Sequence, residues 1–268
     1  MKKLFLLALV GLWWMLGGRD LQAQFLPASA NSVFYFAHFA DGGPPTDRWT
    51  TVFRIVNPQT IENQVAVGRL WFFDPNGNPL PLDFGRGPVT SQPLTIAPKG
   101  AVQLETTGTS GVLRTGFVAA SFDTPVLAVE EFRDWRNGAF ANGASMNASV
   151  GTYLFQTFAD RYMGIAVTNP YVTGTTLYCS GEFLDGTGNF LARNTFMIPG
   201  QGQVSFTLGN VLSVGSAIGS YSITCEFQHN APSGSPLGLF VPLAIAGNSR
   251  GITSSMPPGD FALPSNQY

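Results

Sequence analysis

An internal repeat constrains the fold of this chain more than any other feature. Four short motifs occur twice, in the same order and about 100 to 120 residues apart. In the first copy the motifs span residues 36–41, 49–58, 70–80 and 96–102. Their counterparts in the second copy span residues 155–160, 163–170, 181–191 and 197–204. A period of this length predicts two whole domains, since solenoids repeat every 20 to 50 residues or so.

The repeated segments have the composition of β-strands. Short runs of β-branched and aromatic residues are separated by Gly, Pro, Asn and Asp, and helical periodicity is not sustained after residue 23. In the first copy the predicted strands are residues 33–39, 50–56, 65–73, 101–106, 116–122 and 126–132. In the Asp74–Asn78 turn, Gly77 can take the positive φ that other residues resist. Short strands with frequent turns predict an all-β chain of two β-sandwiches.

The N-terminus has the pattern of an export signal. Lys2 and Lys3 precede an apolar run that ends at Leu16 and is too short to span a bilayer comfortably, and Ala23 offers a cleavage site. No Cys follows the run to carry a lipid anchor. We therefore expect export across the inner membrane, to the periplasm, the cell surface or the medium. The predicted division is a signal peptide 1–23, a first sandwich 24–138, a linker 139–149 rich in Gly and Asn, a second sandwich 150–254 and a tail 255–268.

The repeated motifs resemble those of the immunoglobulin-like modules of bacterial secreted and surface proteins. Each copy has an apolar strand ending in Asn-Pro (Asn57, Asn169), then a strand ending in Asp-x-x-Gly-Asn (Asp74, Asp185), then an apolar-x-Pro step. The arrangement is also similar to uncharacterised two-copy secreted proteins of soil bacteria, in which Phe-Ala-Asp opens each copy. The resemblance covers residues 33–250 and implies two tandem immunoglobulin-like domains in adhesion or scaffolding, without shared catalytic residues.

The net charge of the chain argues against nucleic acid as a partner. Removal of residues 1–23 leaves 11 basic and 15 acidic side chains, a net charge near −4, and Lys99 is then the only lysine. A nucleic-acid surface needs clustered Lys and Arg to displace counterions, so we expect no nucleic-acid partner. A cell-surface protein or a glycan remains open as the partner.

Both cysteines of the chain, Cys179 and Cys225, fall on predicted strands of the second copy. In an exported protein they predict a disulfide. The alternative is a metal site with His229, but the close Cys-x-x-Cys pairing of such sites is missing, and we expect no metal and no cofactor.

The sequence gives only weak support to each candidate catalytic group. Gly247-Asn-Ser249-Arg-Gly251 matches a nucleophile elbow, yet no His follows it and Pro257 comes where a helix should begin, so a turn is favoured. Glu130 and Glu131 point to opposite faces of a strand, and Asp134, which could share a face with Glu130, is expected with it at a solvated strand end. His38 and His229 are interpreted as structural, and Asp41 and Asp160 as turn caps. The loops at Asp74 and Asp185 lack the final acidic ligand of a calcium loop.

These observations favour a secreted, non-catalytic structural, adhesion or assembly protein. The alternative is an extracellular carbohydrate-binding protein, for which exposed aromatic side chains would supply a stacking platform. Trp135 and Trp49 are the candidate ligand contacts, although packing of Trp135 against the second domain is the favoured interpretation. An enzyme would require polar residues of both copies to converge between the domains.

Overall fold

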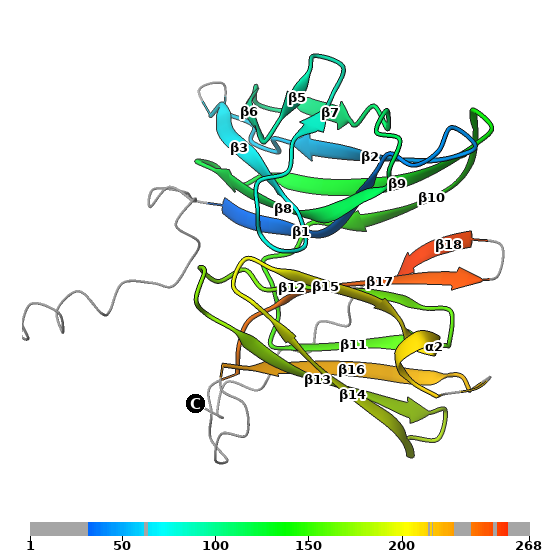
Figure 1. Ribbon diagram of the computed structural model, residues 1–268. Helices are drawn as coiled ribbons and strands as arrows, with labels where there is room; N and C mark the ends of the chain where they lie inside the picture. Colours follow the sequence, from blue (N-terminus) through cyan, green and yellow to red (C-terminus); the bar gives the residue numbers. More distant parts are fainter. Residues whose placement is uncertain are drawn as a thin grey trace, which may run out of the picture.

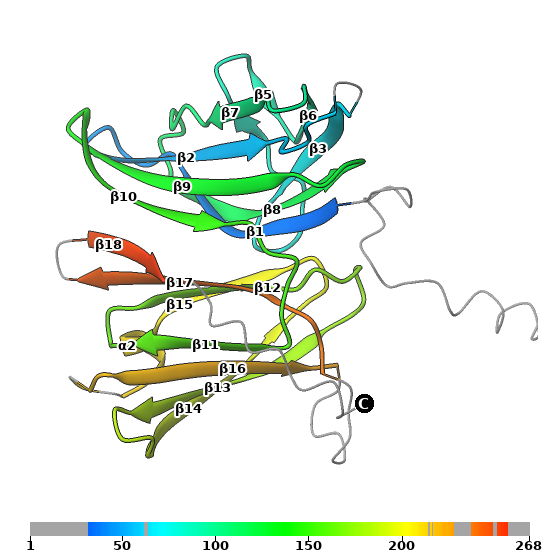
Figure 2. The ribbon, with the colours of Figure 1, turned by 180° about the vertical axis from the view of Figure 1, so that it is seen from behind.

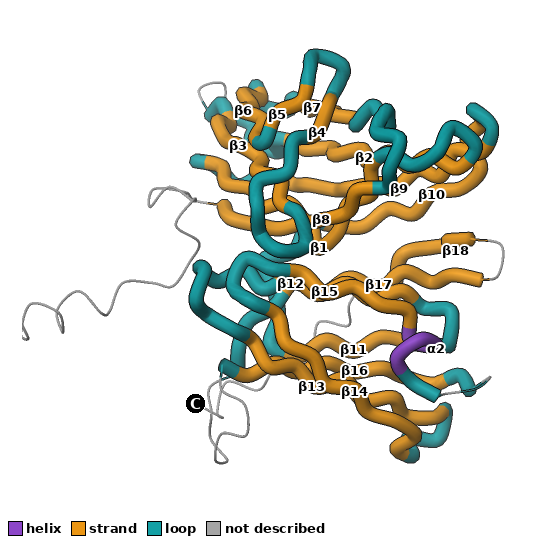
Figure 3. The backbone as a smooth tube through the Cα atoms, viewed as in Figure 1, coloured by secondary structure: helices purple, strands orange, loops and turns teal. Residues whose placement is uncertain are grey.

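The computed structural model describes residues 32–61, 64–213, 215, 217–227, 237–248 and 251–256, and this part of the chain is nearly all β, as expected (Figures 1 and 3). Its one described helix is a single short turn, α2 (Leu208–Val211). Predictions for the signal peptide and for residues 257–268 lie outside the described residues. No helix in the described part is long and apolar enough to cross a membrane.

The strands form an N-terminal and a C-terminal sheet pair, stacked one above the other in Figures 1 and 2. The N-terminal sheet pair contains β1 (Ser32–Asp41), β2 (Asp47–Val56), β3 (Ala66–Phe73), β4 (Leu82–Asp83), β5 (Pro88–Val89), β6 (Ser91–Ile96), β7 (Ala101–Glu105), β8 (Arg114–Phe122), β9 (Leu127–Arg136) and β10 (Ala139–Asn147). The C-terminal sheet pair contains β11 (Leu154–Ala159), β12 (Gly164–Thr168), β13 (Leu177–Asp185), β14 (Phe190–Ile198), β15 (Gln203–Thr207), β16 (Gly219–Glu226), β17 (Val241–Asn248) and β18 (Gly251–Met256).

Both pairs have the same strand order. The N-terminal sheets are β1-β8-β3-β6 and β10-β9-β2-β7, and the C-terminal sheets are β11-β16-β13-β14 and β18-β17-β12-β15. The strands correspond one to one in chain order, and β4 and β5 form a small extra sheet. The pairings between these strands are antiparallel, as in β1 with β8 and β11 with β16.

Alternating side chains fill the space between the two sheets of each pair. In the N-terminal sheet pair, the ring centroids of Phe36 on β1 and Phe53 on β2 are 5.3 Å apart. In the C-terminal sheet pair, Tyr221 is fully buried, and its hydroxyl donates to Asn194 Oδ1 at 2.5 Å. A Cβ at Gly181 would come within 1.8 Å of that hydroxyl, so glycine at 181 makes room for the Tyr221 ring.

Residues 139–149 are not a linker, contrary to the sequence-based prediction. Residues Ala139–Asn147 form strand β10, which pairs with β9 from Arg136 to Val129. Small residues allow this packing: Ala144 is buried, and a Cβ at Gly143 would meet the Phe132 carbonyl oxygen at 2.8 Å. The residues that connect the two sheet pairs are instead 148–153, where Ser149 exchanges backbone hydrogen bonds with Tyr35.

The repeated Asn residues carry the same hydrogen bonds in both copies. Asn57 donates from Nδ2 to two backbone carbonyl oxygens, those of Gln64 and Ile96, while its Oδ1 accepts from Gln59 N. Asn169 donates in the same way to the carbonyl oxygens of Thr175 and Ile198 and accepts from Tyr171 N. Both side chains are fully buried, so each Asn fastens a loop to the end of the strand beside it.

The predicted hairpin turns are present. Oδ1 of Asp74 accepts from the backbone N–H groups of Asn76 and Asn78, and Gly77 has a φ of 82°. Asp185 makes the same contacts with Thr187 and Asn189 in the turn between β13 and β14. Hydrogen bonds from Thr187 and Asn189 hold the pKa of the Asp185 carboxyl well below its usual range. The acidic oxygens of both turns are therefore engaged by the turns themselves.

The two sheet pairs meet at an apolar interface, called the joint from here on. Its buried members are Tyr35, Ala37, Ala40, Phe73, Phe117, Ala119, Phe132 and Ala144 on the N-terminal side and Ala166, Val241 and Leu243 on the C-terminal side. At its centre, Gln203 Nε2 donates to the carbonyl oxygens of Ala37 and Gly116, and Thr168 Oγ1 donates to that of Ala37 at 3.1 Å. Strands β10 and β18 lie side by side across it (Figures 1 and 2).

Candidate functional site

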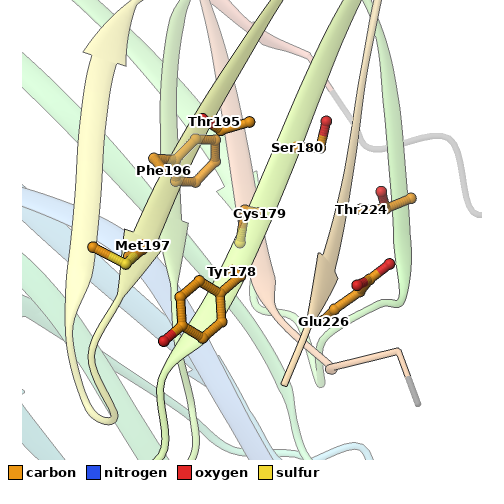
Figure 4. Close-up of a pocket in the computed structure, with 8 residues that line it drawn as sticks. All are labelled: Tyr178, Cys179, Ser180, Thr195, Phe196, Met197, Thr224 and Glu226. Carbon is orange, nitrogen blue, oxygen red and sulfur yellow. The ribbon is translucent and has the colours of Figure 1, made fainter. Parts of the chain in front are cut away.

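A depression on the outer face of the sheet β11-β16-β13-β14 is the candidate recognition site, called the trough from here on (Figure 4). Its cavity measures about 420 Å³. Three strands line it, through the residues Tyr178, Cys179, Ser180, Thr195, Phe196, Met197, Thr224 and Glu226.

Strand register gathers these side chains. Tyr178 lies opposite Met197 on β14 and Glu226 on β16, and Ser180 lies opposite Thr195 and Thr224 in the same way. Residues directly opposite each other project from the same face of a sheet, so the two rows are adjacent. Because side chains alternate, the intervening Cys179 and Cys225 point into the core, where both are buried.

The trough combines the aromatic ring of Tyr178, four hydroxyl groups (that of Tyr178 included) and one carboxylate on an accessible sheet face. Met197 is 61% exposed, and Figure 4 shows it beside Tyr178, with Glu226 on the neighbouring strand. Such a surface offers apolar contact area together with hydrogen-bonding groups of both kinds. Sequence reasoning did not identify it. The available signal was the alternation of Ser, Thr and Tyr with apolar residues at 178–184 and 222–226.

Cys179 and Cys225 form the predicted disulfide. Both sulfur atoms are therefore committed to each other, and the alternative metal site built on free thiolates is wrong. His229 lies outside the described residues. In the described part of the chain, no three His, Cys, Asp or Glu side chains are grouped closely enough to hold a metal ion.

Trp135 is held within the N-terminal sheet pair. It is half-buried, and its indole N–H donates to Thr50 Oγ1 at 2.9 Å. Its ring also meets the Phe140 ring edge-on at 5.8 Å between centroids, with the Arg48 guanidinium 5.4 Å from the ring centroid. Trp49 is half-buried as well and packs against the joint. Neither side chain lines the trough.

Glu130 and Asp134 are not at a solvated strand end, contrary to expectation. Both face the interior of the N-terminal sheet pair, with exposures of 0% and 1%. Neither oxygen of Glu130 has a hydrogen-bond partner in the described structure, whereas Asp134 accepts from Arg136. Burial raises the pKa of the Glu130 carboxyl well above its usual value. Glu131 points to the opposite face, as expected, and pairs there with Arg54 and Arg133.

The repeated Asp residues act differently in the two copies. Asp160 caps a local turn, because its Oδ1 accepts from Tyr162 N at 2.8 Å. Asp41 is almost fully buried, accepts from Gly108 N across 67 residues of sequence, and pairs with Arg114. Turn capping therefore holds for Asp160, while Asp41 fastens a distant loop to β1.

The segment that matches a nucleophile elbow joins two antiparallel strands. Gly247 and Asn248 end β17, and Gly251 begins β18, with Asn248 opposite Gly251. Ser249 itself lies outside the described residues. A hairpin between paired strands differs from the strand-to-helix turn of a nucleophile elbow, and this supports the predicted turn.

Comparison with known proteins identifies no family. No family model and no curated protein matches the chain. Among solved structures, a glycosyl hydrolase family 2 member from Bacteroides cellulosilyticus matches with 8% identity and a TM-score of 0.17, over 83% of this chain and 25% of that chain. A b-glucuronidase from Ruminococcus gnavus matches with 9% identity and a TM-score of 0.16, over 83% of this chain and 35% of that chain. These likenesses are too weak to support an argument about fold or activity.

Proposed function

We propose that the chain is a secreted, non-catalytic protein of two tandem immunoglobulin-like domains that serves adhesion or assembly outside the cell. In this proposal residues 1–23 direct export, and each sheet pair is one domain. The identical strand order and the matching Asn57 and Asn169 hydrogen bonds support a duplicated domain. A disulfide is typical of proteins that fold in an oxidising compartment.

The observation that carries the proposal is the joint. Domains connected by flexible linkers move independently, whereas here an apolar cluster and the buried Gln203 amide fix one sheet pair on the other. A rigid block of this kind can hold a recognition surface at a constant distance from an anchoring surface. The trough supplies the recognition surface, since it lies on the sheet that faces away from the joint (Figure 1).

Binding of labelled residues 24–268 to washed cells of the producing organism tests this function. We expect saturable association that unlabelled protein displaces. Met197→Glu should weaken it, because the change places a charge in the trough at an exposed side chain. Val67→Glu is the matched control, since Val67 is 50% exposed on β3 of the other sheet pair. Absence of saturable binding to cells or their extracellular matrix would overturn the proposal.

A further inference from the structure

A second cavity, called the cleft from here on, opens between the two sheet pairs beside the joint. It measures about 390 Å³, within the range of roughly 300–1,000 Å³ typical of small-molecule sites. His38 of β1 and Thr115 of β8 line it on the N-terminal side. Residues of β12, β15, β17 and α2 line it on the C-terminal side.

The described lining of the cleft is uncharged and combines polar with apolar side chains. On β15, Val204 and Phe206 pack into the core of the C-terminal sheet pair, so the alternating Ser205 and Thr207 project toward the N-terminal sheet pair. With Thr115 and Asn210 they bring three hydroxyl groups and one amide to the cleft. The apolar part of the wall includes Leu243 and Ile245 of β17 as well as residues of β12. Among the lining residues that the structure describes, none is Asp, Glu, Lys or Arg.

His38 adds an imidazole ring to the lining of the cleft. Its Nδ1 lies 3.3 Å from Gln203 Nε2, which can only donate. We assign the lone pair to Nδ1, because an N–H there would face the N–H groups of that amide, and this assignment puts the ring hydrogen on Nε2. Burial lowers the pKa of His38 to about 4, so the ring is neutral at neutral pH. No described residue accepts a hydrogen bond from Nε2–H, and the half-buried ring borders the cleft.

We propose that the cleft binds a single neutral sugar residue, whose hydroxyl groups pair with His38 Nε2–H and with the hydroxyls of Thr115, Ser205 and Thr207. A charged ligand would lose hydration without gaining a partner of opposite charge. An apolar ligand would leave these polar groups unpaired. The apolar wall at Ile245 suits the C–H face of a sugar ring. This site is separate from the trough and does not depend on the adhesive role.

Gly164 provides a variant that fills the cleft without disturbing the fold. It lines the cleft between Thr207 and Ile245, its φ is not positive, and the nearest atom to an added Cβ is the Ile245 carbonyl oxygen at 3.8 Å. Gly164→Val should therefore fold normally and occupy ligand space. Gly111→Val is the matched control, because a Cβ at Gly111 meets nothing within 4 Å and Gly111 lies outside the cleft.

The experiment is a titration of ¹⁵N-labelled residues 24–268 with glucose, galactose, mannose and N-acetylglucosamine, and with glucuronic acid and glucosamine as charged probes. We expect at least one neutral sugar to shift the amide signals of Ser205 and Thr207 saturably. Gly164→Val should weaken that binding roughly tenfold or more, and Gly111→Val should leave it unchanged. Three results would each overturn the proposal: no saturable shift with any neutral sugar, preference for a charged probe, or undiminished binding by folded Gly164→Val.

Discussion

Cys179 and Cys225 stand directly opposite each other on the neighbouring strands β13 and β16, with their Cα atoms 4.1 Å apart. The disulfide of antibody-type immunoglobulin domains joins the two sheets of the sandwich. Here both ends lie in one sheet, behind the trough, so the bridge holds two adjacent strands of the C-terminal sheet pair together. The N-terminal sheet pair has no cysteine to cross-link its strands.

Loss of this disulfide should destabilise the C-terminal sheet pair. Replacing both cysteines by Ala opens a loop with a sequence separation of 46, for which the chain-entropy model gives about 4 kcal/mol. We expect a lower unfolding temperature for the double variant and the same shift for wild type in reductant. Thermal unfolding followed by circular dichroism measures it. An unchanged unfolding temperature in both experiments would show that the strand pairing alone suffices.

The buried Glu130 should make stability fall as pH rises. Its pKa is raised in the folded state well above the ordinary value of 4.5, so the folded protein binds the proton more tightly than the unfolded chain. Its stabilising effect is thus fully present below pH 4.5 and is lost as pH rises through the folded pKa. Between pH 4.5 and the folded pKa, the free energy of unfolding falls by about 1.4 kcal/mol per pH unit.

Glu130→Gln tests this directly, because it keeps the shape and removes the titrating group. In urea unfolding between pH 4 and 8, we expect the variant to be more stable than wild type at pH 8 and to lack the decline. Glu131→Gln is the control, since that residue is only partly buried and pairs with Arg54 and Arg133. Parallel pH profiles for wild type and Glu130→Gln would refute the assignment.

The two repeated Asn residues should be equally important for stability. Asn57→Ala and Asn169→Ala each leave two backbone carbonyl oxygens without their donor, at a cost of roughly 1–3 kcal/mol for each buried group. Asn189→Ala is a matched control, because Asn189 makes its side-chain bonds in an exposed turn, and we expect a change within about 0.5 kcal/mol. Chemical denaturation measures all three. A large difference between the Asn57 and Asn169 variants would argue against equivalent roles.

Gln203→Ala should weaken the joint. The change removes the donor for the carbonyl oxygens of Ala37 and Gly116, both in buried hydrogen bonds. We expect wild type to unfold in one calorimetric transition and Gln203→Ala in two, because each sheet pair keeps its own core. Gln156→Ala, on the outward-facing row of β11, is the control and should keep one transition. One transition in Gln203→Ala at the wild-type temperature would show that the apolar contacts alone fix the joint.

Strand positions were predictable from the sequence because alternation and turn residues are local signals. The predicted strands 33–39, 50–56 and 116–122 all fall within β1, β2 and β8. Strand β10 was missed because its Gly and Asn residues are typical of loops, and only pairing with β9 explains them. Glu130 was misplaced since carboxylates are seldom fully buried, and nothing local indicates which face of β9 is covered.

The apolar character of β1 and β8 on both faces indicates the joint from the sequence alone. Residues 33–40 of β1 and 116–122 of β8 are mostly apolar or small on both faces, which is typical of a sheet covered on both sides. One face packs into the N-terminal core and the other against the C-terminal sheet pair. The polar centre of the joint could not be predicted, because Gln203 and its acceptors Ala37 and Gly116 are brought together only by the tertiary fold.

Trp135 should contribute to stability and leave ligand binding unaffected. Its indole N–H pairs with the buried Thr50 hydroxyl, and its ring packs on Phe140. Trp135→Phe removes the hydrogen bond at a cost of about 1 kcal/mol, and Trp135→Ala adds a packing loss, for roughly 2–3 kcal/mol in total. In urea unfolding, wild type should therefore be the most stable protein, Trp135→Phe less stable and Trp135→Ala the least stable.

A glycan screen of the three folded proteins should give identical profiles, because Trp135 lines neither the trough nor the cleft. Loss of glycan binding in a fully stable Trp135→Ala would instead make this tryptophan a ligand contact.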